Sequence, residues 1–276
     1  MIETTDLMQA AAGDVLTQRV RATWTDGDFG RIAPSFENGA ATFITRLGLT
    51  GRDDVLDVAC GTGNTALPAA RTGARVTAID IAPNLLEQLG SRAVREALAL
   101  DIHEGNCEAL PFEGDRFDTV ITMYGAMFAA RPERAAAELL RVCRAGGKVA
   151  MANWTRTGFI GKMLKTTVAF VPAPSDVPSP LLWGDPEVVQ ERLAGAASLT
   201  VNRRMMPFQF PVSPSGVVQL FRDYYGPTKR AFERLDVAQQ AAFHASLTEL
   251  WSEHNQATDG STYVESEYLE VVAIKG

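Results

Sequence analysis

From Asp53 onward, short apolar runs rich in β-branched residues alternate with segments whose apolar positions have helical spacing. The apolar runs predict strands at 54–60, 74–80, 102–107, 117–123 and 148–154, and the strongest helical spacing between them lies at 133–142. A glycine pair, Gly146-Gly147, predicts a turn before the fifth strand. Strands that alternate with helices form βαβ units, so we expect an α/β fold with a doubly wound, mostly parallel sheet.

Helical spacing at residues 14–25 and 34–47 predicts an N-terminal helical cap over residues 1–50, before the core at 51–154. The next segment, 155–200, is expected to hold a lid insertion and a helix. Five of the chain's 14 prolines fall between Pro172 and Pro186, and a proline-rich insertion that follows a strand's carboxyl end lies beside the ligand crevice.

The C-terminal part, 201–276, is predicted to complete the sheet of a single domain. It contains apolar runs at 205–212 and 263–274 with helices between them, the first at 215–225. The longer helix begins with a capping box, in which Asp236 is followed three residues later by Gln239. Trp251 lies on the apolar face of this helix and offers a face for a homodimer.

Composition narrows the class of partner. The 276 residues carry a net charge of −7 and no basic patch, which disfavours nucleic acid as a substrate. The three cysteines form no CxxC pair, so neither a disulfide framework nor a metal site is expected. The acidic N-terminus lacks the features of a signal peptide and no long apolar run occurs, so we expect a cytoplasmic protein without a membrane span.

The most informative motif is the glycine-rich turn VLDVACGTGNTA at residues 55–66, where a strand runs into a helix. Gly61 and Gly63 allow the backbone to turn sharply and approach a ligand. With Ala66 they also satisfy the dinucleotide fingerprint GxGxxG/A. Asp80 ends the second strand, where a carboxylate can accept hydrogen bonds from ribose hydroxyls in either cofactor class. An NAD(P)-linked oxidoreductase therefore remains an alternative on these residues alone, although no Tyr-x-x-x-Lys pair accompanies them.

Four segments between Asp53 and Trp154 resemble the class I S-adenosylmethionine-dependent methyltransferases, in particular the group similar to the ubiquinone/menaquinone-biosynthesis methyltransferases. They are LDVACGTGN, AIDIAPNLLE, GNCEALPFEGDRFDTV and LLRVCRAGGKV, in the family's order and spacing. The resemblance implies a Rossmann-like, seven-stranded sheet whose last strand is antiparallel. It also implies S-adenosylmethionine as the methyl donor and S-adenosylhomocysteine as the product.

The same resemblance implies which residues surround the methionine part of the cofactor. Backbone groups around Ala59, Gly61 and Gly63 would enclose it. Asp57 would bind its ammonium group directly or through water, and the backbone carbonyl of Met123 would accept a hydrogen bond from that group.

For the nucleoside part, the resemblance implies that Asp80 holds the ribose and that Ile81 packs on one face of the adenine. The Asn106-Cys107 segment would contact the adenine edge. Many relatives carry aspartate where this chain has Asn106, and the amide oxygen can still accept a hydrogen bond, without the charge.

The acceptor pocket is expected beyond the fourth and fifth strands. Phe128, Trp154 and Trp183 are candidates to line it, because electron-rich rings stabilise a sulfonium cation; ordinary packing between the sheet and the lid is the alternative. We expect the N-terminal helices, around Trp24 and Phe29, to close the pocket together with the proline-rich insertion.

The sequence contains no clear candidate for a general base. Tyr124, Tyr225 and His254 are weak catalytic candidates, and alignment for in-line displacement can supply much of the acceleration without a base. The chain lacks the Asp/Asn-Pro-Pro-aromatic turn of DNA amino-methyltransferases and the Pro-Cys of cytosine C5 enzymes. The sequence therefore predicts methylation of a small organic molecule at O, N or C, with a non-catalytic binding module as a second alternative.

Overall fold

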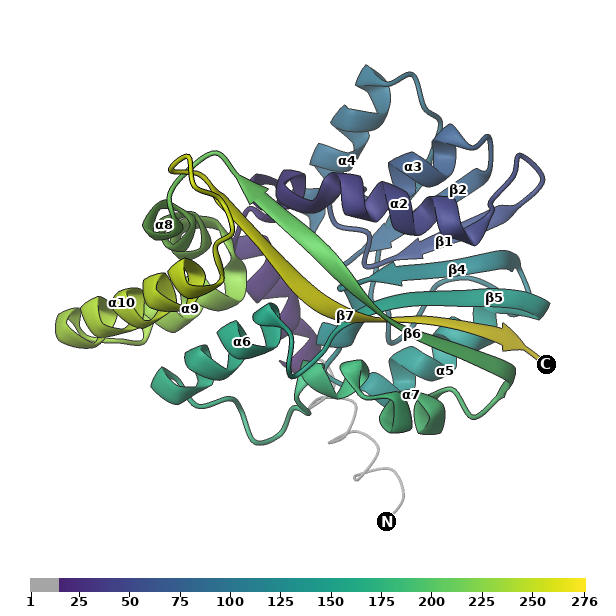
Figure 1. Cartoon of the computed structure of the whole chain (residues 1–276). Helices are drawn as coiled ribbons and strands as arrows, with labels where there is room; N and C mark the ends of the chain where they lie inside the picture. Colours follow the sequence, from purple (N-terminus) through teal and green to yellow (C-terminus); the bar gives the residue numbers. More distant parts are fainter. Residues whose placement is uncertain (1–14) are drawn as a thin grey trace, which may run out of the picture.

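A twisted seven-stranded sheet with the order β3-β2-β1-β4-β5-β7-β6 forms the centre of the protein in the computed structural model, which describes residues 15–276 (Figure 1). Neighbouring strands from β3 to β5 are parallel, whereas β7 is antiparallel to both β5 and β6. The strands are β1 Asp54–Val58, β2 Arg75–Asp80, β3 Asp101–Glu104, β4 Phe117–Met123, β5 Cys143–Trp154, β6 Ala196–Phe210 and β7 Thr262–Lys275. The predicted mostly parallel sheet with an antiparallel last strand is confirmed.

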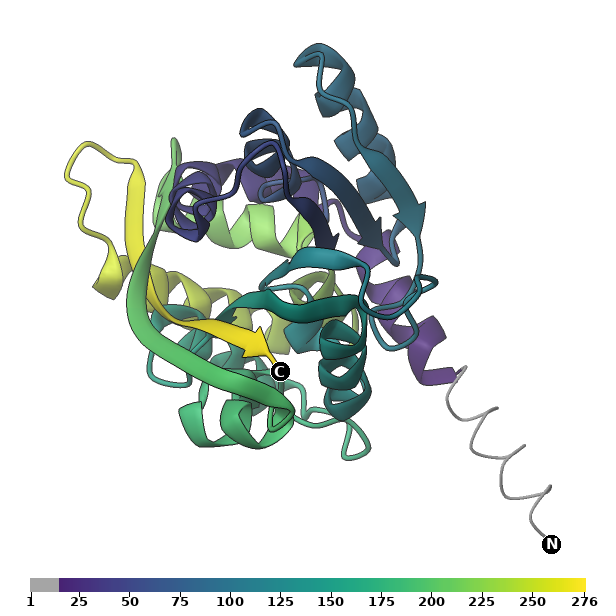
Figure 2. The same cartoon turned by 90° about the vertical axis from the view of Figure 1, so that its right-hand side faces the viewer.

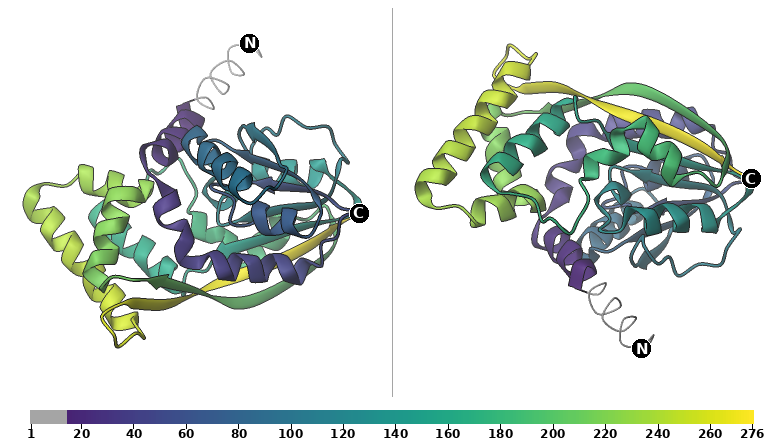
Figure 3. Two further views of the ribbon diagram at one scale, coloured as in Figure 1. Left: turned by 90° about the horizontal axis from the view of Figure 1, so that it is seen from above. Right: turned by 90° about the horizontal axis from the view of Figure 1, so that it is seen from below.

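Helices cover both faces of the sheet, as a doubly wound fold requires. Helices α2, α3 and α4 lie on one face and α5 and α7 on the other, while α6, α8, α9 and α10 gather at one end of the molecule (Figures 1 and 3). The bounds are α2 Glu37–Leu47, α3 Ala66–Arg71, α4 Pro83–Arg95, α5 Pro132–Val142, α6 Phe159–Phe170, α7 Pro186–Arg192, α8 Pro214–Tyr224, α9 Gly226–Glu233 and α10 Val237–His254. The 3-10 helices within residues 15–276 are η1 Phe29–Arg31, η2 Ala33–Phe36, η3 Ala126–Phe128 and η4 Pro180–Gly184.

Strand β5 begins earlier than predicted. The glycine pair Gly146-Gly147 lies inside the strand, where the pairing with β4 shifts its register, and does not form a separate turn. Gly146 has a φ of +73°, and a Cβ on Gly147 would lie 2.8 Å from the carbonyl oxygen of Asp118. The glycines therefore allow an irregularity within a continuous strand. A glycine pair occurs at such irregularities as well as in turns, so the sequence alone does not distinguish the two.

Strand β6 also begins earlier than the predicted 205–212 and pairs with β7 from Ala196 to Phe210. Its first half is mostly exposed because it forms the edge of the sheet, and it carries polar residues such as Asn202 and Arg203. An exposed edge strand lacks the apolar signal on which the sequence prediction depends. Strand β3, at the other edge, ends before Asn106 and is shorter than predicted.

The capping box of α10 is confirmed. Asp236 accepts a hydrogen bond from the backbone N–H of Gln239, whose side chain in turn accepts one from the N–H of Asp236. Trp251 on this helix is fully buried, with ring centroids 4.4 Å from Phe159 and 5.7 Å from Phe210. The Trp251 face is thus covered within the chain and is not available as the dimer face that the sequence suggested.

The N-terminal segment lies between the sheet and the group of helices α8–α10 (Figures 2 and 3). Residues 15–26 are helical, close to the predicted 14–25. Asp14 and the residues before it lie outside the described residues, and so does the N-terminus on which the signal-peptide prediction rests. The loop that follows is fixed on two sides. Asp28 donates its backbone N–H to the carbonyl of Tyr224 over 2.9 Å, and the Asn84 side chain donates to the carbonyl of Gly27 over 3.0 Å.

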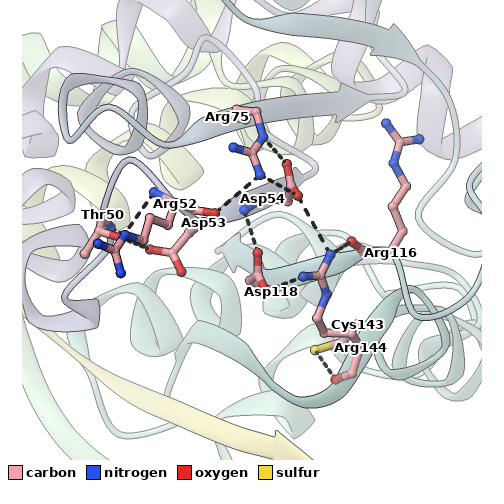
Figure 4. Close-up of polar contacts among 9 residues, drawn as sticks. All are labelled: Thr50, Arg52, Asp53, Asp54, Arg75, Arg116, Asp118, Cys143 and Arg144. Carbon is pink, nitrogen blue, oxygen red and sulfur yellow. Dashed lines mark hydrogen bonds and ion pairs between the residues drawn. The ribbon is translucent and has the colours of Figure 1, made fainter.

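Ion pairs at the amino ends of the strands join neighbouring strands on the edge opposite the cavities described below (Figure 4). Arg75 pairs with Asp54 over 2.6 Å, and Arg144 pairs with Asp118 over 2.6 Å. Asp118 also accepts the backbone N–H of Asp54 over 2.8 Å, which ties β1 to β4. None of the helices among residues 15–276 has both the length and the apolar character needed to cross a membrane.

Candidate active site

A cavity with an empty volume of about 940 Å³ lies at the carboxyl ends of β1, β2, β3 and β4, under the N-terminal segment. A second cavity of about 390 Å³ adjoins it, and the two share lining residues: Trp24, Phe29, Phe36, Tyr124 and Phe128. Ligand sites in open α/β sheets lie at this edge. The larger cavity has the size of a site for a ligand of nucleoside dimensions.

Seven of the nine predicted cofactor residues line the larger cavity: Ala59, Gly61, Asp80, Ile81, Asn106, Cys107 and Met123. Asp57 and Gly63 do not. Gly63 has a φ of +90°, and a Cβ there would lie 2.3 Å from Cδ1 of Leu89. Its glycine is explained by the turn and by the close packing of α4, so direct cofactor contact is not supported by its position.

The loop after β1 is held in an unusual backbone conformation. Ala59 has a φ of +55° and Gly61 a φ of +53°, and Ala59 pays a steric cost there because it has a Cβ. The carboxylate of Asp80 accepts the backbone N–H of Gly61 over 2.7 Å and, through its other oxygen, the N–H of Ala82 over 2.9 Å. Asp80 thus fixes the loop as well as facing the cavity, and each of its oxygens keeps a second lone pair for a ligand hydroxyl.

Asp57 lies fully buried beneath the same loop. Its Oδ2 accepts a hydrogen bond from the Thr65 hydroxyl over 2.7 Å, whereas Oδ1 has no partner. Burial raises the pKa of the Asp57 carboxyl to about 7, against the opposing effect of the Thr65 hydrogen bond. A buried carboxylate oxygen without a partner would be stabilised by a nearby ammonium group, directly or through water.

Beyond β3, the loop contacts the cavity through Asn106, Cys107 and a residue that the sequence did not single out, Glu108. The Asn106 oxygen accepts the backbone N–H of Glu108 over 3.0 Å, so that the side chain shapes its own loop. Glu108 in turn accepts the backbone N–H of Arg131 over 2.9 Å and pairs with its guanidinium. Burial raises the pKa of the Cys107 thiol to about 12, which keeps the thiol protonated at neutral pH.

The residues after β4 lie where the two cavities meet. Tyr124 has a φ of +59° and stacks on Trp154 with ring centroids 3.6 Å apart. Gly125 follows directly, and a Cβ on it would lie 2.5 Å from both Cβ and the carbonyl oxygen of Ala59. This close approach of the two loops is possible only with glycine, and the sequence offered no signal for it other than the residue type.

The predicted acceptor and catalytic residues divide into two groups. Phe128, Trp154, Tyr124 and Tyr225 line the second cavity, together with Ile160 and Met163 of α6. Trp183 and His254 line neither cavity.

Trp183 is buried under the guanidinium of Arg192, which lies 4.6 Å from the ring centroid. His254 lies at the end of α10, with Nε2 2.9 Å from Nζ of Lys162 and Nδ1 3.0 Å from the carbonyl of Leu250. None of the residues that line the two cavities comes from 172–186, so the lid role of the proline-rich stretch stays a prediction. From the 155–200 segment, α6 contributes lining residues.

The N-terminal segment supplies lining residues that were named in part from the sequence. Trp24, Phe29 and Phe36 line both cavities, whereas Thr17 and Val20 line the larger one alone. Helical spacing predicted helices at 14–25 and 34–47, and Phe29 lies in the loop between them; only the tertiary structure shows that these segments cover the cavities. Within residues 15–276 there is no cluster of three metal-ligating side chains.

Comparison with known proteins agrees with this geometry. The methyltransferase domain family matches residues 56–151, the part of the chain that carries the glycine-rich loop, Asp80 and the loop after β3. An uncharacterized protein of Mycobacterium tuberculosis strain H37Rv is 37% identical over 260 residues, which cover 92% of this chain and 93% of that protein. A demethylmenaquinone methyltransferase from Renibacterium salmoninarum is 34% identical over 116 residues, 42% of this chain and 47% of the relative.

Among solved structures, the YcgJ protein from Bacillus subtilis superposes with a TM-score of 0.58 at 16% sequence identity, covering 86% of this chain and 98% of that one. At that identity the likeness concerns the fold. The matched domain, the relatives and the cavity at the carboxyl edge of the sheet lead to one conclusion. The chain belongs to the class I S-adenosylmethionine-dependent methyltransferases, an enzyme family whose cofactor and methyl donor is S-adenosylmethionine.

Proposed function

We propose that this protein transfers the methyl group of S-adenosylmethionine to a small, partly apolar organic molecule bound in the second cavity. The observation that supports this assignment is the continuity of the two cavities: residues that face the larger one at Tyr124 and Phe128 also face the smaller one. A cofactor in the first cavity would then lie next to an acceptor in the second.

The residues of the larger cavity fit the cofactor. The backbone of the Ala59–Gly61 loop and the Met123 end of β4 suit the methionine part, and Asp80 suits the ribose hydroxyls. Ile81 and the Asn106-Cys107 segment line the same cavity on the side of β2 and β3, where the adenine would lie. The unpartnered Oδ1 of Asp57 offers a negative site beneath the loop for the ammonium group.

When bound, S-adenosylmethionine supplies an electrophilic methyl group, and the electron pair of the broken S–C bond stays on sulfur. The protein's part is alignment and exclusion of water. Nine of the twelve residues lining the second cavity are aromatic, and they would hold the acceptor's nucleophilic atom in line with the methyl group. An O–H or N–H acceptor must also release a proton, and we infer that His254 does not accept it, because His254 lies outside both cavities.

Calorimetric titration with S-adenosylhomocysteine, beside NADH, tests the donor. We expect micromolar binding of S-adenosylhomocysteine and none of NADH. Asp80→Ala should abolish that binding, whereas Asp118→Ala, on the opposite edge of the sheet, should retain it. NADH binding in place of S-adenosylhomocysteine binding would reject the assignment in favour of the oxidoreductase.

Transfer of a labelled methyl group to a metabolite extract, read by mass spectrometry, separates an enzyme from a non-catalytic binding module. A labelled product that is absent with Asp80→Ala supports the enzyme. Tight binding of S-adenosylhomocysteine without a labelled product would favour the binding module. We also propose a cytoplasmic location, since Cys60, Cys107 and Cys143 are all free.

A further inference from the structure

The second cavity is almost entirely apolar. No charged side chain is among its lining residues in the described part of the chain. They are Trp24, Phe29, Ile32, Phe36, Tyr124, Phe128, Trp154, Ile160, Met163, Phe208, Phe221 and Tyr225. Apart from the indole N–H groups, the polar side-chain atoms in this set are the hydroxyls of Tyr124 and Tyr225.

The hydroxyl of Tyr124 is buried and has no hydrogen-bond partner. A satisfied network lies close by: Arg46 donates to the Tyr268 hydroxyl over 2.7 Å, and Tyr268 approaches Glu270 at 3.3 Å. Tyr124 packs edge-on against Tyr268, with ring centroids 5.8 Å apart, yet forms no bond with that network. An unpaired buried hydroxyl costs free energy, so a ligand group that pairs with this one would be stabilised by it.

Backbone and packing fix the Tyr124 ring in place. Its positive φ is a strained conformation for a residue with a Cβ, and such strain is concentrated at functional sites. Trp154 stacks on one face of the ring, and Phe36 contacts it edge-on with centroids 6.0 Å apart. The hydroxyl therefore has little freedom to find another partner.

Tyr225 lies where the N-terminal segment covers the second cavity. It precedes α9 and is 5% exposed, and its ring contacts Trp24, Phe29 and Phe221 with centroids 5.8, 6.2 and 5.2 Å away. Burial alone raises the pKa of its hydroxyl, and burial is the main cause that raises the pKa of Tyr124. Both phenols stay protonated at neutral pH and can donate hydrogen bonds.

We propose that the methyl acceptor is an uncharged ring compound with at least one hydrogen-bonding group, and that the hydroxyls of Tyr124 and Tyr225 bind this group. The proposal rests on the proposed function and specifies its substrate class. A charged acceptor would lose its hydration without gaining an ionic partner from the cavity. A cation would gain from the aromatic faces, but that gain is smaller than the free energy that its desolvation costs.

A matched series of probes tests the charge and the polar group separately. 2-Naphthol, naphthalene, 2-naphthoate and (2-naphthyl)methylammonium share one ring system, and equilibrium dialysis measures each with and without saturating S-adenosylhomocysteine. We expect 2-naphthol to bind at least 10-fold more tightly than either ion and several-fold more tightly than naphthalene. Equal or tighter binding of either ion, or no binding of any member, would overturn the proposal.

The variants Tyr124→Phe and Tyr225→Phe locate the hydrogen bonds. Each should reduce the preference for 2-naphthol over naphthalene at least 3-fold, and the double variant should remove it. Tyr224→Phe is the matched control: this neighbouring tyrosine lines neither cavity and has Arg31 over its ring at 5.7 Å. A purely structural Tyr124 would leave the preference unchanged and would change only the melting temperature on substitution, a result that would contradict the assignment.

Failure of the proposed acceptor class can be distinguished from failure of the proposed function. Binding of S-adenosylhomocysteine together with selection of ions over 2-naphthol would reject the acceptor class and leave the methyltransferase assignment standing. Selection of 2-naphthol by a protein that binds no S-adenosylhomocysteine would reject the donor and leave the chemistry of the cavity as described.

Discussion

The carboxylate of Asp80 accepts the backbone N–H of Gly61 over 2.7 Å, which joins the end of β2 to the loop after β1. One side chain thus both shapes the glycine-rich loop and faces the cavity. Because burial raises its pKa and the backbone N–H groups of Ala82 and Gly61 oppose that effect, the carboxylate depends on these donors. Loop geometry and ligand binding are therefore coupled at this position.

The contact between Gly125 and Ala59 predicts that Gly125→Ala damages the site. A Cβ would overlap the Ala59 backbone, so we expect a loss of about 1–3 kcal/mol in unfolding free energy and at least 10-fold weaker S-adenosylhomocysteine binding. Urea unfolding and calorimetry measure the two effects. Gly90→Ala in α4 is the control, since its Cβ would meet only Ile102 at 3.9 Å, and it should stabilise the helix by about 0.5–1 kcal/mol. Equal effects of the two variants would contradict this packing.

The buried Asp57 predicts a pH dependence of stability. Its pKa is raised to about 7 in the folded protein from an ordinary value of 3.8, so the protonated carboxyl stabilises the fold at low pH. This contribution is complete below pH 3.8 and is lost as the pH rises through about 7. Unfolding free energies of Asp57→Asn should therefore fall less than those of the wild type between pH 5 and 8. Parallel pH curves for the two proteins would show that Asp57 does not titrate in this range.

The same titration predicts that cofactor binding strengthens with pH. An ammonium group near Asp57 favours the ionised carboxylate, so S-adenosylhomocysteine affinity should rise between pH 6 and 8. Calorimetry across this range measures the slope, and Asp57→Asn should flatten it. A slope that persists in the variant would assign the proton to another group.

The pair Arg46–Glu270, which Arg204 also joins, connects α2 to β7 in a partly buried setting. Arg46→Met should cost about 2–4 kcal/mol of unfolding free energy because it leaves the buried Glu270 carboxylate with one cation fewer. Desolvation opposes ionisation of Glu270, but Arg46 and Arg204 outweigh it and lower the pKa of this carboxyl below its ordinary value of 4.5. The ionised carboxylate therefore stabilises the fold above pH 4.5, and this stabilisation is lost as the pH falls. Thermal unfolding at pH 7 and pH 4 should show a smaller difference between variant and wild type in acid.

A matched surface pair provides the control. Arg203 of β6 and Glu267 of β7 form an ion pair over 2.6 Å, but the Arg203 side chain is 53% exposed. Arg203→Met should therefore change the unfolding free energy by only about 0–1 kcal/mol. A loss as large as that of Arg46→Met would show that burial does not distinguish the two pairs.

The capping box of α10 predicts a local stability effect. Asp236→Ala removes the acceptor for the Gln239 N–H and should cost about 1 kcal/mol, measured by urea unfolding. Glu249→Ala, at an exposed position within the same helix, should be close to neutral. Similar losses in both variants would indicate a general effect on the helix and no specific role for the cap.

The pattern of apolar residues predicted the interior strands well, because these strands are buried on both faces and appear in the sequence as apolar runs. Strand β4 is observed at the predicted residues 117–123. The outer half of β6 was missed for the opposite reason: at the sheet edge its side chains meet solvent, and pairing with β7 holds it in place. Burial was also misjudged for Trp251, which the helical pattern placed on an apolar face without showing that Phe159 and Phe210 cover that face.

The sequence alone determined the parallel core, the glycine-rich turn and the carboxylate of Asp80, because each depends on residues close together in the chain or on motifs with fixed spacing. Only the tertiary structure decided which aromatic side chains meet. Trp24, Tyr124 and Tyr225 come from three distant segments and line one cavity, while Trp183 and His254 lie elsewhere. The physical reason is that apolar side chains carry no directional signal in sequence: the same aromatic residue fills a core or lines a pocket, and the packing of the whole chain determines which.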